Sequence, residues 1–434
     1  MESIWRDTAA IPTFPRLDHD LKTDVLIVGG GLAGVLCACF LEQDGVNYAL
    51  IESDRIFNGV SGFTTAKITV QHGLIYEKLI RRYGVEAAQI YYQANAAALA
   101  DYRRLCSGIG CDFETADAYV YSVDRRKKLE KELSAQERIG CPAEFVRDLP
   151  LPFPTEGGIR ITDQAQFHPL KFAAEISRGL HIYEHTAARE FVGNTVLTDH
   201  GRIQASKIII ATHFPVINKH GSYFLKLYQH RSYVLALSNG QNVNGMYMDE
   251  RKTGLSFRNY QNLLILGGGA HRTGKPGGDW EPLSTFSKTH YPAAIEKYRW
   301  ATQDCMSLDG IPYIGQYSKH TPDLYVATGF NKWGMTSSMV AAGILRDLVQ
   351  GRENAYAAVF SPSRTILHPQ LACNAAEAVA HLVTPTRPRC PHMGCALKWN
   401  PQEHTWDCPC HGSRFGKDGK LLNNPATDDL NCHE

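Results

Sequence analysis

Residues 24–34 read DVLIVGGGLAG, and this stretch decides the fold of most of the chain. Its first half, which is apolar and partly β-branched, predicts a buried strand, and residues 32–43 predict the helix that follows. Gly29, Gly31 and Gly34 match the spacing G-x-G-x-x-G. The first glycine of this motif permits a tight turn, the second admits a pyrophosphate, and the third lets helix and strand pack closely. The stretch therefore predicts a Rossmann-like, dinucleotide-binding domain.

A second strand is predicted over 48–51 and ends at Glu52. An acidic residue at this place is positioned to accept hydrogen bonds from the adenosine ribose, and it would repel the 2′-phosphate of NADP. The order of strand, glycines, helix, strand and acidic end therefore favours FAD or NAD. The alternative is a glycine-rich strand–helix turn that binds no ligand.

Composition narrows the class of protein. The chain has 434 residues, 45 Lys and Arg against 44 Asp and Glu, 44% hydrophobic and 21% charged residues, as in ordinary globular proteins. Its net charge of +1 excludes a chain that binds nucleic acid over its whole length. The longest apolar run, 25–41, is rich in glycine, so a buried strand and helix explain it better than a membrane span. Because the start of the chain shows no leader, we expect a cytoplasmic protein.

Three further stretches carry a family resemblance: ATHFP at 211–215, DGIPYIG at 309–315 and ATGFNKWGMT at 327–336. With VGGGLAG at 28–34 and Glu52, they make the chain resemble the FAD-dependent oxidoreductases of the D-amino-acid oxidase (glycine/sarcosine oxidase-like) superfamily. The resemblance covers most of the chain and implies FAD as the dinucleotide. Carried over, the implied cofactor-binding residues are Gly29, Gly31, Gly34, Glu52, Thr64, Thr65, Asp309, Gly310, Gly315, Gly329, Gly334, Met335 and Thr336.

The resemblance also implies roles within this set. Asp309, Gly310 and Gly315 are expected near the ribityl chain and the pyrophosphate. Residues 334–336 are expected to begin a helix at the pyrimidine edge of the flavin, where a positive helix end stabilises the negative charge of the reduced ring. Residues 58–67 are expected to pack on the flavin.

Strands within 223–233 and 246–272 are implied to roof the flavin ring. The candidates for the substrate face are Tyr228, His230, Arg231, Tyr233 and His271. Each has an ordinary alternative, as a polar residue on an edge strand or as a satisfied core histidine. His72 and Cys305 lie where relatives sometimes tether FAD covalently, but a simply buried side chain is favoured at both positions. The pattern assigns no catalytic base.

Residues 390–415 read CPHMGCALKWNPQEHTWDCPCHGSRF and contain the pairs Cys390-x-His392 and Cys408-x-x-His411. Two cysteines and two histidines in short pairs would hold a structural zinc ion. The loops CPHMGC and CPCHGS, however, resemble those of the Rieske family. That resemblance implies a [2Fe–2S] cluster, with the cysteines on one iron and the histidines on the other. It also implies a disulfide between Cys395 and Cys410, which is unusual in a reducing compartment.

This Rieske-like tail departs from the respiratory pattern in two ways. Phe415 stands where the respiratory proteins have Tyr, whereas Ser413 is kept. The missing hydroxyl predicts a reduction potential below that of the respiratory class, because hydrogen bonds to the ligand sulfurs raise it. The tail is also short, since a predicted helix at 374–383 and the linker TPTRPR precede Cys390 directly. We therefore expect it to lean on the flavoprotein body.

The sequence thus predicts an α/β and α+β protein: a FAD-binding Rossmann-like (glutathione-reductase-type) domain, an antiparallel-sheet substrate domain and a small all-β Rieske-like module. The expected oxidoreductase spans 1–360, a helical linker 361–386 and the module 387–434. The FAD-binding part is expected at about 20–75, 155–220 and 296–351, and the substrate part at about 76–154 and 221–295.

The expected function is flavin-dependent oxidation of a small amine or amino acid at a C–N bond. Electrons would pass from FAD to the [2Fe–2S] cluster and on to a redox partner protein or another acceptor. One alternative is an electron-transfer flavoprotein without a small substrate of its own. Another is an oxidase whose metal tail is structural or senses redox state. No nucleic acid or membrane span is expected among its partners.

Overall fold

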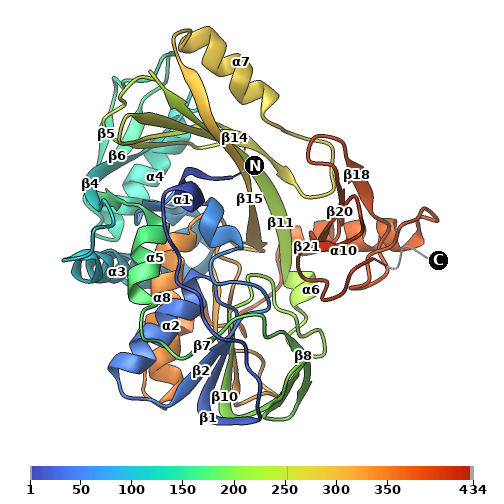
Figure 1. The fold of residues 1–434 in the computed structure, drawn as a ribbon. Coiled ribbons are helices and arrows are strands. Elements are labelled where there is room, and N and C mark those ends of the chain that lie inside the picture. Colours follow the sequence, from blue (N-terminus) through green and yellow to red (C-terminus); the bar gives the residue numbers. More distant parts are fainter. Residues whose placement is uncertain (1, 252, 431–434) are drawn as a thin grey trace.

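A computed structural model describes residues 2–251 and 253–430, and within these ranges the strands form three sheets (Figure 1). The first sheet has eight strands and a parallel centre, in which β1 lies between β10 and β2. Its strands in spatial order are β16 (Tyr313–Gln316), β17 (Leu324–Thr328), β10 (Arg202–Ile210), β1 (Leu21–Val28), β2 (Tyr48–Ile51) and β7 (Ile182–Tyr183), with β8 (Ala188–Val192) and β9 (Thr195–Thr198) beside β10.

This sheet is the predicted dinucleotide-binding domain. The second half of β1 is buried on both faces, as expected of a central parallel strand. The helices α2 (Leu32–Gln43) and α8 (Gly334–Val349) pack against each other and against the strands that precede them. Each begins directly after a strand and a glycine-containing turn, so both N-termini lie at the carboxyl edge of the sheet.

The second sheet has nine strands, and most of its pairs are antiparallel. In spatial order they are β15 (Ile295–Ser307), β11 (Leu227–Ser238), β14 (Leu263–Arg272), β13 (Ser256–Tyr260), β12 (Met246–Asp249), β4 (Glu114–Tyr121), β6 (Gly158–Gln166) and β3 (Lys67–Ile68), with β5 (Ala143–Val146) beside β6. The helices α4 (Arg126–Arg138) and α7 (Glu281–His290) pack on this sheet, and the long helix α3 (Tyr76–Cys106) packs against α4 and against α8 of the first domain.

The expected division of the body differs from the observed sheets at three strands. The sequence assigns 20–75, 155–220 and 296–351 to the FAD-binding part, yet β3, β6 and β15 pair within the second sheet. The physical reason is their partners, since β3 and β4 both run antiparallel to β6, and β15 runs antiparallel to β11. All three strands therefore belong to the second sheet.

The remaining short elements connect these layers. They are α1 (Ile4–Asp7), the 3-10 helix η1 (Val60–Phe63), α5 (Pro169–Ile176), α6 (Tyr223–Lys226) and α9 (Ala357–Phe360). In α1 the fully buried Trp5 donates from Nε1 to the carbonyl of Thr64, at 2.7 Å. The N-terminal segment is thereby tied to the turn that is expected to pack on the flavin.

The third sheet is the Rieske-like tail, and each of its strands has three residues. Helix α10 (Pro369–Val383) comes first, followed by β18 (Lys398–Asn400), β19 (Thr405–Asp407), β20 (Arg414–Gly416) and β21 (Leu421–Asn423) in sequential antiparallel order. The tail lies at one side of the molecule, next to β11 and α6 (Figure 1). We call residues 387–430 the Rieske module and residues 2–360 the body.

A search of the helices in the described ranges finds none that is long and apolar enough to cross a membrane.

Candidate flavin site and metal centre

The glycine turn after β1 has no room for side chains. Gly29 has φ +113°, and a Cβ on it would lie 2.6 Å from the carbonyl oxygen of Ala211 at the end of β10. A Cβ on Gly34 would lie 2.0 Å from the carbonyl oxygen of Gly29. Gly31 is the N-cap of α2, and its residue type offers the first turn no side-chain cap. The three glycines therefore place an open helix N-terminus at the sheet edge, as phosphate binding requires.

Glu52 links the ends of the first two strands. Its Oε2 accepts from the backbone N–H of Gly30 at 2.7 Å, and its Oε1 accepts from Ser53 Oγ and from the N–H of Asp54. The carboxylate thus fixes the glycine turn relative to β2. It lies where a ribose-binding acid is expected in this fold.

Helix α8 supplies a second open N-terminus. Trp333 is its N-cap and makes no side-chain capping bond, and a Cβ on Gly334 would meet no described atom within 4 Å. Thr336 Oγ1 lies 3.0 Å from Nε2 of His72, which is fully buried against α8. The carbonyl of Met335 accepts from the hydroxyl of Tyr102 at 2.9 Å. The first turn of α8 is therefore held from both sides, and its N–H groups remain available.

The turn that carries Thr64 and Thr65 is fixed from behind. The guanidinium of Arg258 donates from Nη1 to the carbonyls of Thr65 and Ala66, at 2.9 and 2.6 Å. Lys67 follows this turn, and burial together with the nearby charges of Arg258 and Lys332 lowers its pKa to about 7. The turn is therefore rigid, and it ends in a buried amine that can gain or lose a proton near neutral pH.

The structure places the remaining implied FAD residues as follows. Gly310, Gly315 and Gly329 all have positive φ, at 86°, 135° and 70°. The Asp309 carboxylate, however, is engaged by Arg364, at 2.7 and 2.9 Å, and by the hydroxyl of Tyr83. This part of the expected ribityl site therefore offers backbone groups, while the Asp309 side chain anchors the segment that follows α8.

These features fit a bound dinucleotide. Two helix N-termini of different strand–turn–helix units open towards the same sheet edge, and neither N-cap residue makes a side-chain capping bond, although the N–H of Leu32 in α2 donates to Ser61 Oγ at 2.9 Å. Among the described residues, Ser337 Oγ and Gln71 Oε1 are buried polar atoms without a hydrogen-bond partner. Ser337 lies in the first turn of α8, so its unpaired hydroxyl fits a site that a cofactor completes.

The four implied metal ligands lie on two neighbouring loops of the Rieske module, which the disulfide between Cys395 and Cys410 joins. Cys390 and Cys408 are buried, and the rings of His392 and His411 lie 5.0 Å apart. The pKa of Cys390 is lowered to about 7 by hydrogen bonds from the thiol of Cys408 and from Ser413, so its thiolate is accessible at neutral pH.

The two ring nitrogens of each histidine lie in different surroundings. Within the part of the chain that the structure describes, Nδ1 of His392 and Nδ1 of His411 are buried without a hydrogen-bond partner. Nε2 of His392 donates to Asn218 Oδ1 at 2.9 Å, and Nε2 of His411 donates to the carbonyl of Phe224 at 3.0 Å. A metal-bound histidine is typically oriented by such a bond from its other nitrogen, so both Nδ1 atoms fit metal ligands.

A disulfide joins Cys395 and Cys410, as the resemblance implies. It connects the two ligand loops across a sequence separation of 15 residues. The sulfurs of Cys395, Cys408 and Cys410 lie within 4.8 Å of one another. The disulfide is therefore packed directly against the metal site.

The substrate-face candidates lie against the Rieske module. Arg231 and Tyr233 both bind the carboxylate of Glu403, and His271 stacks on Tyr233 with ring centroids 5.8 Å apart. Tyr228 lies under the guanidinium of Arg272, which donates to the carbonyls of Pro409 and Cys410 in the second ligand loop, and His230 packs edge-on against Tyr228.

Sequence reasoning missed the partners of these residues. Glu403 lies in the spacer between the two ligand pairs, where a charged residue in a turn is unremarkable. Gln229 and Gln303 donate to the carbonyls of His411 and Gly412, at 2.9 and 2.8 Å. Both glutamines are buried in strands, and nothing in the local sequence distinguishes them from other polar strand residues.

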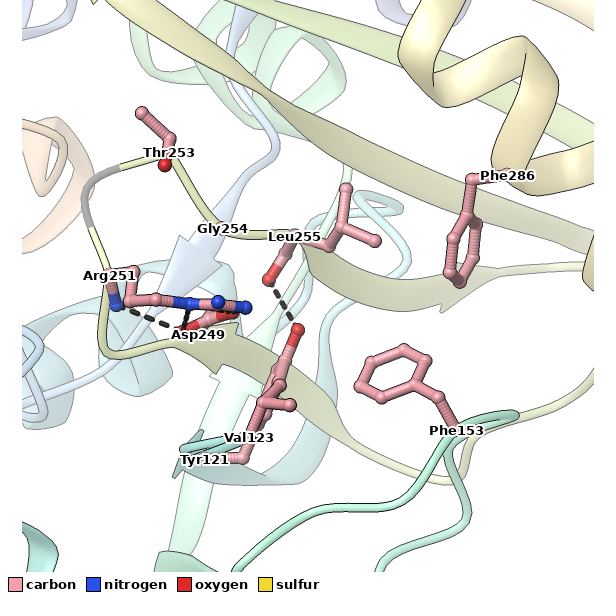
Figure 2. A pocket seen from close by; sticks show the side chains of 9 residues that line it. All are labelled: Tyr121, Val123, Phe153, Asp249, Arg251, Thr253, Gly254, Leu255 and Phe286. Atoms are coloured by element: carbon pink, nitrogen blue, oxygen red, sulfur yellow. Dashed lines mark hydrogen bonds and ion pairs between the residues drawn. The ribbon is translucent and has the colours of Figure 1, made fainter. Parts of the chain in front are cut away.

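Figure 2 shows the lining of a cavity of about 320 Å³ beside the ends of β4 and β12 in the second sheet. Phe153 and Phe286 line one side of it, and the ion pair between Asp249 and Arg251 lines the other. Its lining contains none of the residues that the sequence singles out, so we assign it no role.

Comparison with known proteins decides the family. The model of the FAD dependent oxidoreductase (DAO) family matches residues 24–348, and that of the Rieske [2Fe-2S] domain matches residues 379–434. The chain belongs to the FAD dependent oxidoreductase family. This oxidoreductase therefore uses FAD, and its Rieske domain holds a [2Fe–2S] cluster in place of the zinc ion that the ligand spacing alone left open.

Three relatives illustrate the breadth of the family. This oxidoreductase is 33% identical to YhfW of Bacillus subtilis (strain 168), described as a Rieske 2Fe-2S iron-sulfur protein, over 99% of this chain and 97% of the relative. It is 23% identical to gamma-glutamylputrescine oxidoreductase of Escherichia coli (strain K12), over 84% of this chain and 93% of the relative. Glycine oxidase from Geobacillus kaustophilus has a similar fold, with TM-score 0.67 and 19% identity over 80% of this chain and 100% of that chain.

Proposed function

We propose that this oxidoreductase oxidises a small amine or amino acid at a C–N bond and exports the electrons through its own Rieske cluster to an external acceptor. The observation that carries the proposal is the position of the ligand loops. The imidazole of His411 is 3% exposed and donates to Phe224 of the body, and Gln229 and Gln303 hold the same loop by its carbonyls. The loop that carries Cys408 and His411 is thus packed against the body, which supports electron transfer from the FAD-binding part to the module.

FAD held at the N-termini of α2 and α8 would accept the two electrons released, with two protons, when the substrate C–N single bond becomes a C=N bond, and a cluster held by the Rieske module would pass electrons on one at a time. The residues of the chain bind the cofactor and orient the turns around it. The open N-termini of α2 and α8 supply backbone N–H groups, and Arg258 fixes the turn at Thr65. Lys67 Nζ can hold or release a proton near neutral pH, because its pKa is about 7.

The choice of substrate class rests on the relatives. Structures of similar fold include a glycine oxidase and an L-proline dehydrogenase, the latter from P. horikoshii with TM-score 0.67. Those names describe reactions at a C–N bond, and they motivate the same class here. The cluster favours a dehydrogenase over an oxygen-using oxidase, because a one-electron relay suits a separate acceptor.

A cytoplasmic location is part of the proposal. Six cysteines of the body are both free and buried, among them Cys37, Cys106 and Cys305. Free thiols of this kind fit a reducing compartment. The disulfide between Cys395 and Cys410 is buried beside the metal ligands, where access for reductants is restricted.

The test is an anaerobic reduction of the holoprotein with glycine, sarcosine, L-proline and putrescine as separate probes. Bleaching of the flavin absorbance, followed by the EPR signal of a reduced cluster, is the expected result with at least one probe. The variant Cys408→Ser is expected to keep flavin bleaching and to lose reduction of ferricyanide. Reduction of the cluster by dithionite but by none of the amines would favour a relay protein without its own substrate. Unchanged oxygen turnover in Cys408→Ser would favour an oxidase with a structural tail.

A further inference from the structure

We propose that Arg231 is a positioning residue, which fixes the Rieske module on the body through Glu403 and keeps the His411 side of the metal centre turned towards the body. The inference deepens the proposed function and rests on it. It assigns Arg231 a role different from the substrate contact that the family resemblance implies. It also implies that an external acceptor approaches the module from a side other than that of His411.

The contact is a buried clamp on one carboxylate. Arg231 donates from Nε to Glu403 Oε1 at 3.0 Å and from Nη2 to Oε2, and Tyr233 donates its hydroxyl to Oε1 at 3.2 Å. Arg414 of the module donates to Oε2 at 2.9 Å. The side chains of Arg231, Glu403 and Arg414 are 5%, 8% and 6% exposed. Two-pronged bonds between a guanidinium and a carboxylate restrict both distance and angle, so this contact fixes orientation.

The charges in the clamp balance. Arg414 also donates from Nε to Asp407 Oδ1 at 3.0 Å, so two guanidinium groups face two carboxylates. A buried charge is tolerated when it is paired, and removal of one partner leaves the other uncompensated. Undocking of the module would break the bonds that Arg231 and Tyr233 donate to Glu403. These bonds therefore favour the docked arrangement over a freely moving module.

Arg414 connects the clamp to the metal centre. It directly follows Ser413, whose carbonyl accepts from the N–H of Cys408 at 2.8 Å. A second attachment lies one loop away, where Gly412 approaches Gln229 so closely that a Cβ on the glycine would lie 2.6 Å from the Gln229 Cβ. Gly412 has φ +87°, so the residue type suits both the turn and the approach. The clamp and this contact together hold the second ligand loop against β11.

The competing interpretation keeps Arg231 as an anchor for a substrate carboxylate, with Glu403 occupying its place until substrate arrives. That interpretation predicts competition, because a carboxylate substrate and Glu403 would share one guanidinium. It makes Glu403 an inhibitory group, whereas the proposal makes it a requirement for electron transfer. The two interpretations therefore predict opposite effects of removing the Glu403 charge.

The test uses the full-length holoprotein with Glu403→Gln, Arg231→Lys and the control Asp199→Asn. The control makes the same change of carboxylate to amide in an exposed ion pair, between Asp199 and Arg189 on the body. EPR of the dithionite-reduced proteins first establishes that each variant holds its cluster. The flavin is then photoreduced anaerobically, and cluster reduction is followed with time. Amide exchange of residues 401–414 is measured in parallel.

Glu403→Gln is expected to slow cluster reduction at least 10-fold and to speed amide exchange of 401–414 at least 10-fold, with the EPR signal retained. Arg231→Lys keeps the charge but loses the two-pronged geometry, so it should fall between this variant and the wild type. Asp199→Asn should match the wild type. If Glu403→Gln reduced its cluster and exchanged its amides at the wild-type rates, the proposal would be overturned. A gain in substrate turnover in that variant would overturn it as well.

The same experiment distinguishes a failure of the proposed function from a failure of the role of Arg231. If the photoreduced flavin of the unaltered protein never reduced the cluster, electron export through the Rieske module would be refuted. The exchange measurement would then still report whether Glu403 and Arg231 fix the module.

Discussion

The body and the Rieske module are stabilised by different means. The body has a large apolar core that includes Ile27, Leu36 and Leu50, and its longest strand, β15, has 13 residues. The core of the module has seven buried residues, and four of them are cysteines: Cys390, Cys395, Leu397, Cys408, Cys410, Phe415 and Ala426. Its strands have three residues each. The body therefore owes its fold to hydrophobic burial, whereas the module depends on cross-links and on its contacts with the body.

The largest effect is expected from Cys408→Ser, which removes an implied ligand. We expect loss of iron and a rise in amide exchange throughout 387–430, because a metal site of this size provides much of the folding free energy of a small module, at least about 3 kcal/mol. The body should keep its FAD. Iron analysis and exchange mass spectrometry measure both effects. Cys373→Ser is the matched control, since Cys373 is a free and exposed thiol on α10. If the amides of the iron-free module exchanged as slowly as those of the wild type, the module would not depend on its metal site for stability.

The converse change is Gly34→Ala in the body. A Cβ at this position would lie 2.0 Å from the Gly29 carbonyl, so the glycine turn must move and FAD affinity should fall at least about 100-fold, or roughly 3 kcal/mol. The EPR signal of the cluster should persist, because the module does not use this turn. Gly343→Ala is the control, since a Cβ there meets no atom of the described residues within 4 Å. Wild-type retention of FAD in Gly34→Ala would show that the turn adapts.

Local patterns in the sequence predicted much of both regions. The glycine spacing predicted the β1–α2 turn because each glycine answers a steric demand that a neighbouring strand or helix creates. The loops around Cys390 and Cys408 predicted a set of four ligands, and the structure places the rings of two of them, His392 and His411, 5.0 Å apart. These features are encoded by residues close to one another in the chain, or by family motifs.

The docking of the module could not be predicted in the same way. Arg231 and Glu403 are 172 positions apart, and each is an ordinary residue in its own segment. Their pairing depends on how the third sheet lies on β11, and no periodicity or motif specifies that. The five substrate-face candidates were selected because they stand on the right strands. The sequence pattern indicated the strands on which these residues lie. It did not indicate which side chains on those strands face another domain.

The body should also respond to pH at a site far from the module. Burial raises the pKa of Glu132 to about 7, although its carboxylate accepts from the N–H groups of Tyr76 and Glu77. At pH values between the ordinary pKa of a glutamate and this raised pKa, the carboxyl group of Glu132 is protonated in the folded state and ionised in the unfolded state. The contribution of Glu132 to stability is therefore present at low pH and lost as pH rises towards about 7, by about 3 kcal/mol.

Glu132→Gln should flatten this dependence. Denaturant unfolding of the body at pH 5 and pH 8 measures it, and the free energy of unfolding of the wild type should fall more than that of the variant between the two pH values. Exchange in the module should respond equally to pH in both proteins, since Glu132 lies on α4. Parallel pH profiles of the two proteins would show that another group carries the titration.

The smallest effect is expected inside the module, from Phe415→Tyr. Phe415 is fully buried in the same core as Cys390, and the sequence predicts that its missing hydroxyl lowers the reduction potential. A hydroxyl that donates to a ligand sulfur favours the reduced cluster, and about 1 kcal/mol of such preference corresponds to roughly 40 mV for one electron. An EPR-monitored redox titration should therefore show a rise of that order.

Ser413→Ala provides the opposing variant. Ser413 hydrogen-bonds to Cys390 and helps to lower the pKa of that thiol, so its loss should lower the reduction potential by a similar amount. Opposite shifts in the two variants would show that hydrogen bonds at the sulfurs set the potential even in a module that depends on its body for support. A fall in Ser413→Ala without a rise in Phe415→Tyr would mean that the ring at position 415 cannot bring its hydroxyl to a sulfur. The contacts with the body, rather than the shortened core, would then determine how far the potential can be raised.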